Sequence, residues 1–362
     1  MVIEMKLMVS ELFTGNRGVM SRSVMKMEEV LLDWLLKGAV ALAMVGSLVG
    51  CGGGGSKMSP TPTQPPAAIT TGVYVIQNPA APGNGSGEIL QFSKTATGNV
   101  NPTGTITAPT NTAFIYLATD GTGNVYSSAG DIREYTAGAT GSATPIRSLP
   151  MNATTKLGAV QGLYTSESGE IFVSEDSGGV ASFSAMANGS VAPTRYILGA
   201  SQTGGGLSGL ISSNNVVADS ADNLYVVNEG NGAYGIGVFG STATGNVAPT
   251  RTFGGFANGL AIDSAGNVYG TDAGVIKIYG PAASGNDAPI REITGALTKL
   301  GHLGGIRLDS AGSIYVVSTD ATGKNPTVLK FASGADGNVA PVSSFTSSAW
   351  TNPDFGLSIA VY

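Results

Sequence analysis

Residues 260–269 read Leu-Ala-Ile-Asp-Ser-Ala-Gly-Asn-Val-Tyr and decide the fold, because they place a tight polar turn between two apolar runs. This pattern is typical of a strand–turn–strand hairpin, in which the aspartate caps the turn and the glycine supplies a positive φ. Related stretches recur at Asp120–Tyr126, Asp219–Tyr225 and Asp309–Tyr315, and we interpret Glu167–Phe172 as a shortened copy. The chain therefore repeats one hairpin, and this repeat carries more weight for the fold than the pattern of any single segment.

A second motif, Gly-x-x-x-Pro, follows a further short apolar strand in every copy. Its six copies begin at Gly98, Gly141, Gly189, Gly245, Gly285 and Gly337. Four copies carry an arginine two residues after the proline, namely Arg147, Arg195, Arg251 and Arg291. Proline has no N–H to donate, so the strand after it fits the outer edge of a sheet. Each unit therefore has four expected strands, of which the strand after the proline is the outermost.

Counting the units gives the architecture. Residues 72–362 hold six copies of about 48 residues each, and four-stranded units of this length are typical of propeller blades. The first copy lacks its first strand and begins at Gly72–Ile76, whereas the chain ends on a first strand without a hairpin. We expect residues 357–361 to pair with 73–77, because closing the ring removes exposed strand edges. The predicted fold is all-β, a six-bladed β-propeller closed by the C-terminal strand in the first blade.

The composition agrees with this fold and excludes several classes of function. Glycine is 54 of 362 residues, charged residues are 12% and hydrophobic residues 42%, which suits short strands joined by glycine turns. A net charge of −6 argues against a protein that binds nucleic acid, because such proteins carry a basic surface. One cysteine and one histidine exclude a disulfide scaffold and a Cys/His zinc site. The histidine, His302, has no Gly-x-Ser-x-Gly elbow to serve, which argues against a Ser-His-Asp triad.

The N-terminal region is not part of the repeat. Residues 39–50 form a short apolar run behind Lys37, and spanning a membrane takes about 20 apolar residues. We therefore interpret residues 1–50 as a secretory signal segment, which a start at Met20 or Met25 would bring to ordinary length. Residues 51–71 are rich in glycine and proline and form a tether. Residues 72–362 are the propeller.

The end of the signal segment, Leu48-Val49-Gly50-Cys51, resembles the lipobox of bacterial lipoproteins. The resemblance implies that Cys51 carries the lipid and that the chain is cut before it. Each buried lipid methylene contributes about 0.8 kcal/mol to membrane binding. Because Gly52 is not aspartate, the resemblance favours the outer membrane or the cell surface over the inner membrane.

The repeats resemble those of NHL-type six-bladed β-propellers and, more loosely, the gluconolactonase/regucalcin superfamily. In such a ring the first strand of each blade lines the channel, and the starts of first strands meet the ends of second strands at one mouth. The residues expected at this mouth are Gln161, Glu175, Asn214, Asn228, Asn258, Asp272 and Asp354.

Carboxylate and amide oxygens that converge on an axis suit a hard cation such as Ca²⁺. The candidate metal ligands are Glu175, Asn214, Asn258, Asp272 and Asp354, and Gln161 and Asn228 are candidate binding residues. The resemblance to gluconolactonases implies a metal site at Asn258 and, one residue out of register, at Asp354, whereas that family's glutamate has no match. Alternatively, the amides satisfy buried backbone groups and channel waters.

The four arginines after the prolines also have two interpretations. A stripe of arginines could bind an anionic glycan. We expect instead that each pairs with a backbone carbonyl or an aspartate of a neighbouring blade, with Asp219, Asp263 and Asp309 as candidates.

Two functions remain open. The first is a monomeric, membrane-anchored, non-catalytic scaffold that binds a protein, a peptide or an envelope glycan. The second is a divalent-metal-dependent, lactonase-like hydrolase or lyase that uses the channel mouth. The amide-rich mouth favours the scaffold, because asparagine and glutamine cannot accept a proton as a general base does. The carboxylates Glu175, Asp272 and Asp354 favour the enzyme.

Overall fold

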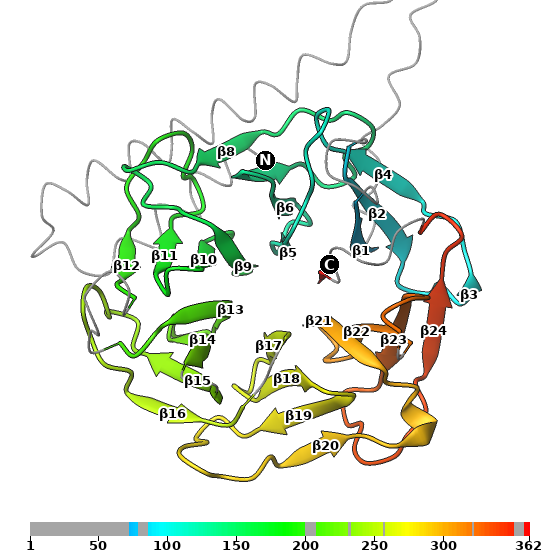
Figure 1. The fold of residues 1–362 in the computed structure, drawn as a ribbon. Coiled ribbons are helices and arrows are strands. Elements are labelled where there is room, and N and C mark those ends of the chain that lie inside the picture. The colour runs from blue at the N-terminus through cyan, green and yellow to red at the C-terminus, as the bar shows by residue number, and fades with distance from the viewer. Residues whose placement is uncertain are drawn as a thin grey trace, which may run out of the picture. The chain divides into compact units, whose positions relative to one another are not determined.

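The computed structural model describes residues 72–78, 86–199, 208–230, 233–255, 258–320, 322–350 and 358–362. The chain divides into two units, Met1–Thr63 and Gln64–Tyr362, and all described residues belong to the second. In that unit six sheets are arranged in a ring around a central axis, as Figure 1 shows. The signal segment, Cys51 and the tether lie outside the described residues.

Each blade has four antiparallel strands, which follow one another from the channel to the rim (Figure 1). Blade 1 has β25 (Ile359–Val361), β1 (Gly72–Gln77), β2 (Glu88–Ser93) and β4 (Gly104–Thr107). Blade 2 has β5 (Leu117–Thr119), β6 (Val125–Ser128), β7 (Asp131–Tyr135) and β8 (Arg147–Pro150). Blade 3 has β9 (Val160–Thr165), β10 (Ile171–Glu175), β11 (Val180–Phe183) and β12 (Arg195–Ile197).

The other three blades follow the same plan. Blade 4 has β13 (Ser212–Ala218), β14 (Leu224–Gly230), β15 (Ala233–Phe239) and β16 (Arg251–Phe253). Blade 5 has β17 (Leu260–Ile262), β18 (Val268–Asp272), β19 (Val275–Tyr279) and β20 (Arg291–Ile293). Blade 6 has β21 (His302–Leu308), β22 (Ile314–Thr319), β23 (Thr327–Phe331) and β24 (Ser343–Thr346).

The ring is closed inside blade 1 by the two ends of the propeller. Strand β25 pairs antiparallel with β1, with Val361 opposite Val73 and Ile359 opposite Val75. The main chains of Tyr362 and Gly72 then exchange two hydrogen bonds, of 3.0 and 3.1 Å. The predicted six-bladed fold and its closing strand are confirmed.

The A–B hairpin turn, which joins the first two strands of a blade, is held by its aspartate. In blade 5 Asp263 Oδ1 accepts the main-chain N–H groups of Ala265 and Asn267, and Asp263 Oδ2 accepts the Tyr269 hydroxyl at 3.0 Å. The prediction that blade 3 has a shortened turn is wrong. Ser166 stands six residues before Phe172, the spacing of Asp263 and Tyr269, so this turn has full length and a different chemistry.

The Gly-x-x-x-Pro motif joins neighbouring blades, a role that the sequence did not indicate. Gly245 of blade 4 donates its N–H to the Tyr196 carbonyl of blade 3 at 2.7 Å and accepts the Leu198 N–H at 3.0 Å. At the blade 1 copy the pairing is a short parallel strand, β3 (Gly98–Asn99), beside β24. All six motif glycines have φ between 55° and 73°, which glycine adopts at little cost. Each motif is thus a backbone clip between adjacent blades.

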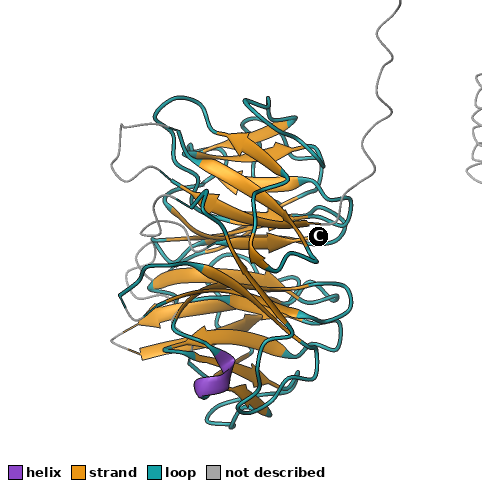
Figure 2. Cartoon of the chain, turned by 90° about the vertical axis from the view of Figure 1, so that its right-hand side faces the viewer, coloured by secondary structure: helices purple, strands orange, loops and turns teal. Residues whose placement is uncertain are grey.

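The hydrophobic core lies between the blades and not at the axis. It divides into six clusters, each built from two neighbouring blades, and the one between blades 5 and 6 packs Tyr269, Ile276 and Ile278 against Ile306 and Phe331. Figure 2 shows that strands make up most of the unit, with one short helical turn, η1 (Ala296–Thr298). The described part of the chain holds no helix that could cross a membrane.

Candidate functional site

An arginine occupies the channel. The guanidinium of Arg307, on β21, donates to four main-chain carbonyls at 2.8 to 3.3 Å. The acceptors are Leu117 of blade 2, Leu163 of blade 3, Leu260 of blade 5 and Ile306 of blade 6. Because these carbonyls lie on the innermost strands of different blades, a group that reaches all four must lie across the axis.

The surroundings of Arg307 set its chemistry. The innermost strands present an unpaired edge to the channel, and buried carbonyls need a donor. Burial lowers the pKa of Arg307 to about 10, so the guanidinium stays charged at neutral pH. Arg307 lies opposite Tyr315, the aromatic residue of the second strand in its own blade. In three other blades the residue opposite the second-strand aromatic is an alanine, namely Ala118, Ala261 and Ala360. Alanine at those three positions leaves room for the longer side chains of Arg307 and of Tyr164, which holds the same position in blade 3.

The structure brings several of the expected mouth residues to the same end of their blades. Glu175, at the end of β10, lies opposite Val160, and Asn228 of β14 lies opposite Ser213. The register shifts at this point in blades 3, 4 and 6, so the starts of β9, β13 and β21 carry β-bulges. Bulges re-aim side chains and are frequent beside functional sites.

The amides at this mouth are engaged with neighbouring groups. Gln161 Oε1 accepts the Tyr116 hydroxyl of blade 2 at 3.1 Å, and Asn258 Nδ2 donates to the Leu303 carbonyl of blade 6 at 3.0 Å. Asn228 caps its own blade by accepting the Ile211 N–H at 2.8 Å and donating to the Gly209 carbonyl at 2.9 Å. These amides link blades or close loops, which agrees with the alternative that the amides satisfy backbone groups.

Glu175 is the exception, because it is a buried carboxyl with one free oxygen. It is 2% exposed, and its Oε2 accepts the hydroxyls of Ser177 and Tyr196, each at 3.2 Å. Its Oε1 has no hydrogen-bond partner among the described residues. Burial raises the pKa of Glu175, against hydrogen bonds that act to lower it. The protonated form is therefore favoured more than in a solvated glutamate.

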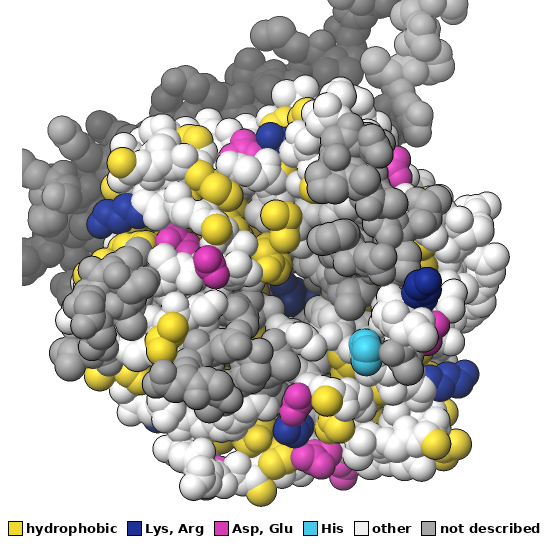
Figure 3. Space-filling model, viewed as in Figure 1, with side chains coloured by type: hydrophobic (Ala, Val, Ile, Leu, Met, Phe, Trp, Pro, Cys, Tyr) yellow, Lys and Arg dark blue, Asp and Glu magenta, His cyan; other side chains and the backbone are white. Residues whose placement is uncertain are grey.

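The remaining candidate metal ligands do not gather into one site. Asp272 forms an ion pair of 2.9 Å with Lys277 of its own hairpin. Asp354 and the side chain of Asn214 lie outside the described residues. Within the described part of the chain, no three His, Cys, Asp or Glu side chains stand close enough together to hold a metal ion. Figure 3 likewise shows charged side chains scattered over this face, with both signs mixed.

The arginines after the prolines mostly link blades, as expected. Arg251 donates to the Pro281 carbonyl of blade 5 at 2.6 Å, and Arg291 donates to the Ser333 and Ala335 carbonyls of blade 6, both at 3.0 Å. The contact between these arginines and the predicted aspartates is indirect. Arg291 contacts the Tyr269 hydroxyl at 3.1 Å, and this hydroxyl donates to Asp263. Arg147 differs, because it pairs with Glu134 of its own blade.

No protein-family model matches this chain, and no curated protein matches its sequence. A crystal structure of a protein of unknown function from Bacteroides caccae is similar over 81% of this chain and 98% of its own, with a TM-score of 0.55 and 9% identity. The WD40 β-propeller domain of Doa1 is similar over 77% of this chain and 83% of its own, with a TM-score of 0.49 and 14% identity. At 9% identity the first likeness supports the fold and nothing finer.

Proposed function

We propose that the protein is an exported, lipid-anchored β-propeller of the NHL type that acts as a non-catalytic binding scaffold in the cell envelope. The observation that carries the non-catalytic part is Arg307. A positive charge at the axis at neutral pH repels a divalent cation there, because charges interact strongly where water is scarce. The mouth amides support the same conclusion, since their hydrogen bonds hold blades together.

The cellular address in this proposal rests on the N-terminal sequence. Leu48–Cys51 resembles a lipobox and Gly52 follows it, which favours lipidation at Cys51 and residence in the outer membrane or at the cell surface. The tether at residues 51–71 would hold the propeller away from the bilayer. A protein, a peptide or a glycan would each suit a rigid disc as partner.

A second function, a metal-dependent lactonase-like hydrolase or lyase, is favoured by Glu175. A carboxyl with a raised pKa and a free oxygen has the properties of a general acid or base. However, it is sealed from solvent, and a general base must come within hydrogen-bonding distance of its substrate. This function therefore ranks second.

Metal analysis tests the choice between the two. Protein purified without chelator is expected to contain no stoichiometric Ca²⁺ or Zn²⁺ and to hydrolyse none of a panel of simple lactones. Asp272→Ala and Asp354→Ala should then leave the metal content unchanged. A full equivalent of metal that is lost in either variant would overturn the scaffold proposal.

Cell fractionation tests the address. Wild-type protein is expected in the outer-membrane fraction in processed form, and Cys51→Ser is expected unprocessed or in the soluble fraction. Gly53→Ser, two residues along the same glycine run, is the matched control and should fractionate as wild type. A Cys51→Ser protein that is still processed and membrane-bound would contradict the lipid anchor.

A further inference from the structure

Blade 3 departs from the repeat on the face that carries the A–B turns. Where blade 5 has Asp263, Asn267 and Tyr269, blade 3 has Ser166, Glu170 and Phe172. In blade 5 the tyrosine hydroxyl joins the turn aspartate to the outer-strand arginine, with 3.0 Å to Asp263 and 3.1 Å to Arg291. Blade 3 therefore keeps its arginine but lacks the hydroxyl that contacts the arginine in blade 5 and the aspartate that accepts from that hydroxyl.

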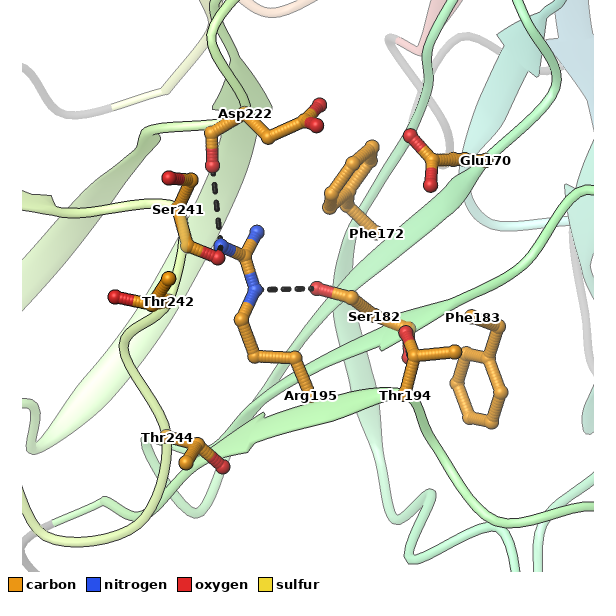
Figure 4. A pocket seen from close by; sticks show the side chains of 10 residues that line it. All are labelled: Glu170, Phe172, Ser182, Phe183, Thr194, Arg195, Asp222, Ser241, Thr242 and Thr244. Carbon is orange, nitrogen blue, oxygen red and sulfur yellow. Dashed lines mark hydrogen bonds between the residues drawn. The ribbon is translucent and has the colours of Figure 1, made fainter. Parts of the chain in front are cut away.

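That arginine, Arg195, is only partly engaged. Its Nη1 donates to the main-chain carbonyls of Asp222, at 3.1 Å, and Ser241 in blade 4, and its Nε contacts Ser182 Oγ at 3.4 Å. Among the described residues no hydrogen bond is made by Nη2, the atom whose counterpart in Arg291 contacts a tyrosine hydroxyl. Figure 4 shows the free terminal nitrogen directed into the space between Asp222 and Phe172.

This space is a cavity of about 260 Å³ between blades 3 and 4. Its floor is buried and is formed by Phe172, Phe183 and Ser182. Its open side is lined by hydroxyl side chains, namely Thr194, Ser241, Thr242 and Thr244. The volume is below the range of about 300–1,000 Å³ that is usual for drug-sized ligands, so one small ring is the largest ligand that fits.

The charges around the cavity decide what kind of ligand it suits. Two carboxylates, those of Glu170 and Asp222, line the cavity together with the single guanidinium of Arg195. Burial lowers the pKa of Arg195, while both carboxylates act in the opposite direction, so the three groups are close enough to interact. An anion would meet an excess of negative charge here, and an apolar molecule would strip water from charged groups without replacing their hydrogen bonds. A neutral molecule with several hydroxyls can donate to the carboxylates and accept from the arginine.

We propose that this cavity binds a single neutral sugar unit, presented at the end of an envelope glycan. The inference rests on the proposed function as a binding scaffold and names its ligand class. Phe172 and Phe183 close the inner end of the cavity, and the polar rim gives hydrogen bonds to the hydroxyls of the sugar. The blade 4 wall departs from the repeat as well, because Asp222 stands at the glycine position of its turn with φ of 60°. Non-glycine residues held in this strained conformation cluster at ligand sites.

Saturation-transfer NMR with D-glucose, D-galactose, D-mannose and N-acetyl-D-glucosamine tests the proposal on the purified full-length protein. At least one sugar is expected to bind, with millimolar affinity. Arg195→Gln and Glu170→Gln should each weaken that sugar at least about tenfold. Arg291→Gln removes the equivalent arginine of blade 5, where the tyrosine is present, and should leave sugar binding unchanged.

A second variant separates loss of binding from loss of folding. Ser166→Asp combined with Phe172→Tyr restores the pair found in blade 5, so the fold should persist while the cavity is filled and binding is lost. Binding of none of the four sugars, binding that survives both Arg195→Gln and the double variant, or preferential binding of glucuronate or glutamate would each overturn the sugar site. The metal and fractionation tests of the scaffold proposal do not depend on sugar binding. The sugar site can therefore fail while the scaffold proposal stands, and the scaffold proposal can fail on its own tests.

Discussion

At the residue scale, the channel depends on one side chain that the sequence did not single out. Arg307 stands in an Ile-Arg-Leu-Asp stretch that resembles any strand with one solvent-facing charge. The signal that could have found it is its register, since three other blades place alanine at the same position. Mouth residues such as Gln161 and Asn258 could be placed from hairpin spacing, but the partners of these two could not, because those partners come from neighbouring blades.

Replacing Arg307 should loosen the ring. Arg307→Met removes a charged donor from four carbonyls and is expected to lower the free energy of unfolding by about 2–3 kcal/mol. Urea unfolding followed by circular dichroism measures the change. Lys324→Met, which removes an exposed charge, should have an effect below about 0.5 kcal/mol. Equal effects of the two substitutions would mean that the channel hydrogen bonds contribute no net stability.

Glu175 should make stability depend on pH. Because burial raises its folded pKa above the ordinary value of a glutamate, its contribution to stability is complete below about pH 4.5 and is lost as pH rises through the folded pKa. Glu175→Gln should therefore be more stable than wild type at neutral pH and equally stable in mild acid. Urea titrations at the two pH values check this, with the exposed Glu167→Gln as control. A neutral-pH loss of stability in Glu175→Gln would contradict the buried-acid interpretation.

At the element scale, the hairpins and the outer edges could be predicted because their signals are local. A turn aspartate, a positive-φ glycine and a proline each act within a few residues of the chain. The Gly-x-x-x-Pro clip could not be predicted, since a glycine that turns the chain and one that also pairs with the next blade look the same in sequence. The β-bulges at the starts of β9, β13 and β21 were missed for a related reason, because they depend on how two strands are paired.

The clip can be tested at one glycine. Gly337→Ala places a side chain at φ of 67° and is expected to cost about 1–2 kcal/mol of stability. Gly334→Ala lies in the same loop, also has open space around a built Cβ, and has no positive φ. It should be neutral or slightly stabilising when both variants are unfolded by heat. A destabilised Gly334→Ala would show that the loop is limited by space and not by backbone conformation.

The closing strand gives a second prediction at this scale. Ile359 is fully buried against blades 1 and 6, so Ile359→Ala should cost about 2–5 kcal/mol. For a domain of this size that corresponds to a fall in Tm of several degrees per substitution. The exposed Ile290→Ala on the rim is the matched control and should change Tm little. An unchanged Tm for Ile359→Ala would contradict closure by β25.

At the scale of the whole molecule, tyrosines in neighbouring blades share one environment. Burial raises the pKa of the four second-strand tyrosines whose hydroxyls contact turn aspartates, namely Tyr126, Tyr225, Tyr269 and Tyr315. Each keeps its proton longer when folded, so stability is complete below about pH 10 and falls as pH rises above it. The tyrosinate absorbance of these four side chains, measured as the difference from a variant with all four replaced by phenylalanine, should therefore appear together with unfolding, and not before it. Early, gradual ionisation of these four in the folded protein would contradict their burial.

The pairing of β25 with β1 also fixes the order in which the chain can fold. Strand β1 is made first, but its partner follows 288 residues later, since Val73 lies opposite Val361. At about 5–20 residues per second, synthesis leaves one edge of β1 open for roughly 15–60 seconds. An open edge is a template for pairing with another chain. The five blades made after it can each be completed from their own consecutive strands, so blade 1 is the slow and exposed step of assembly.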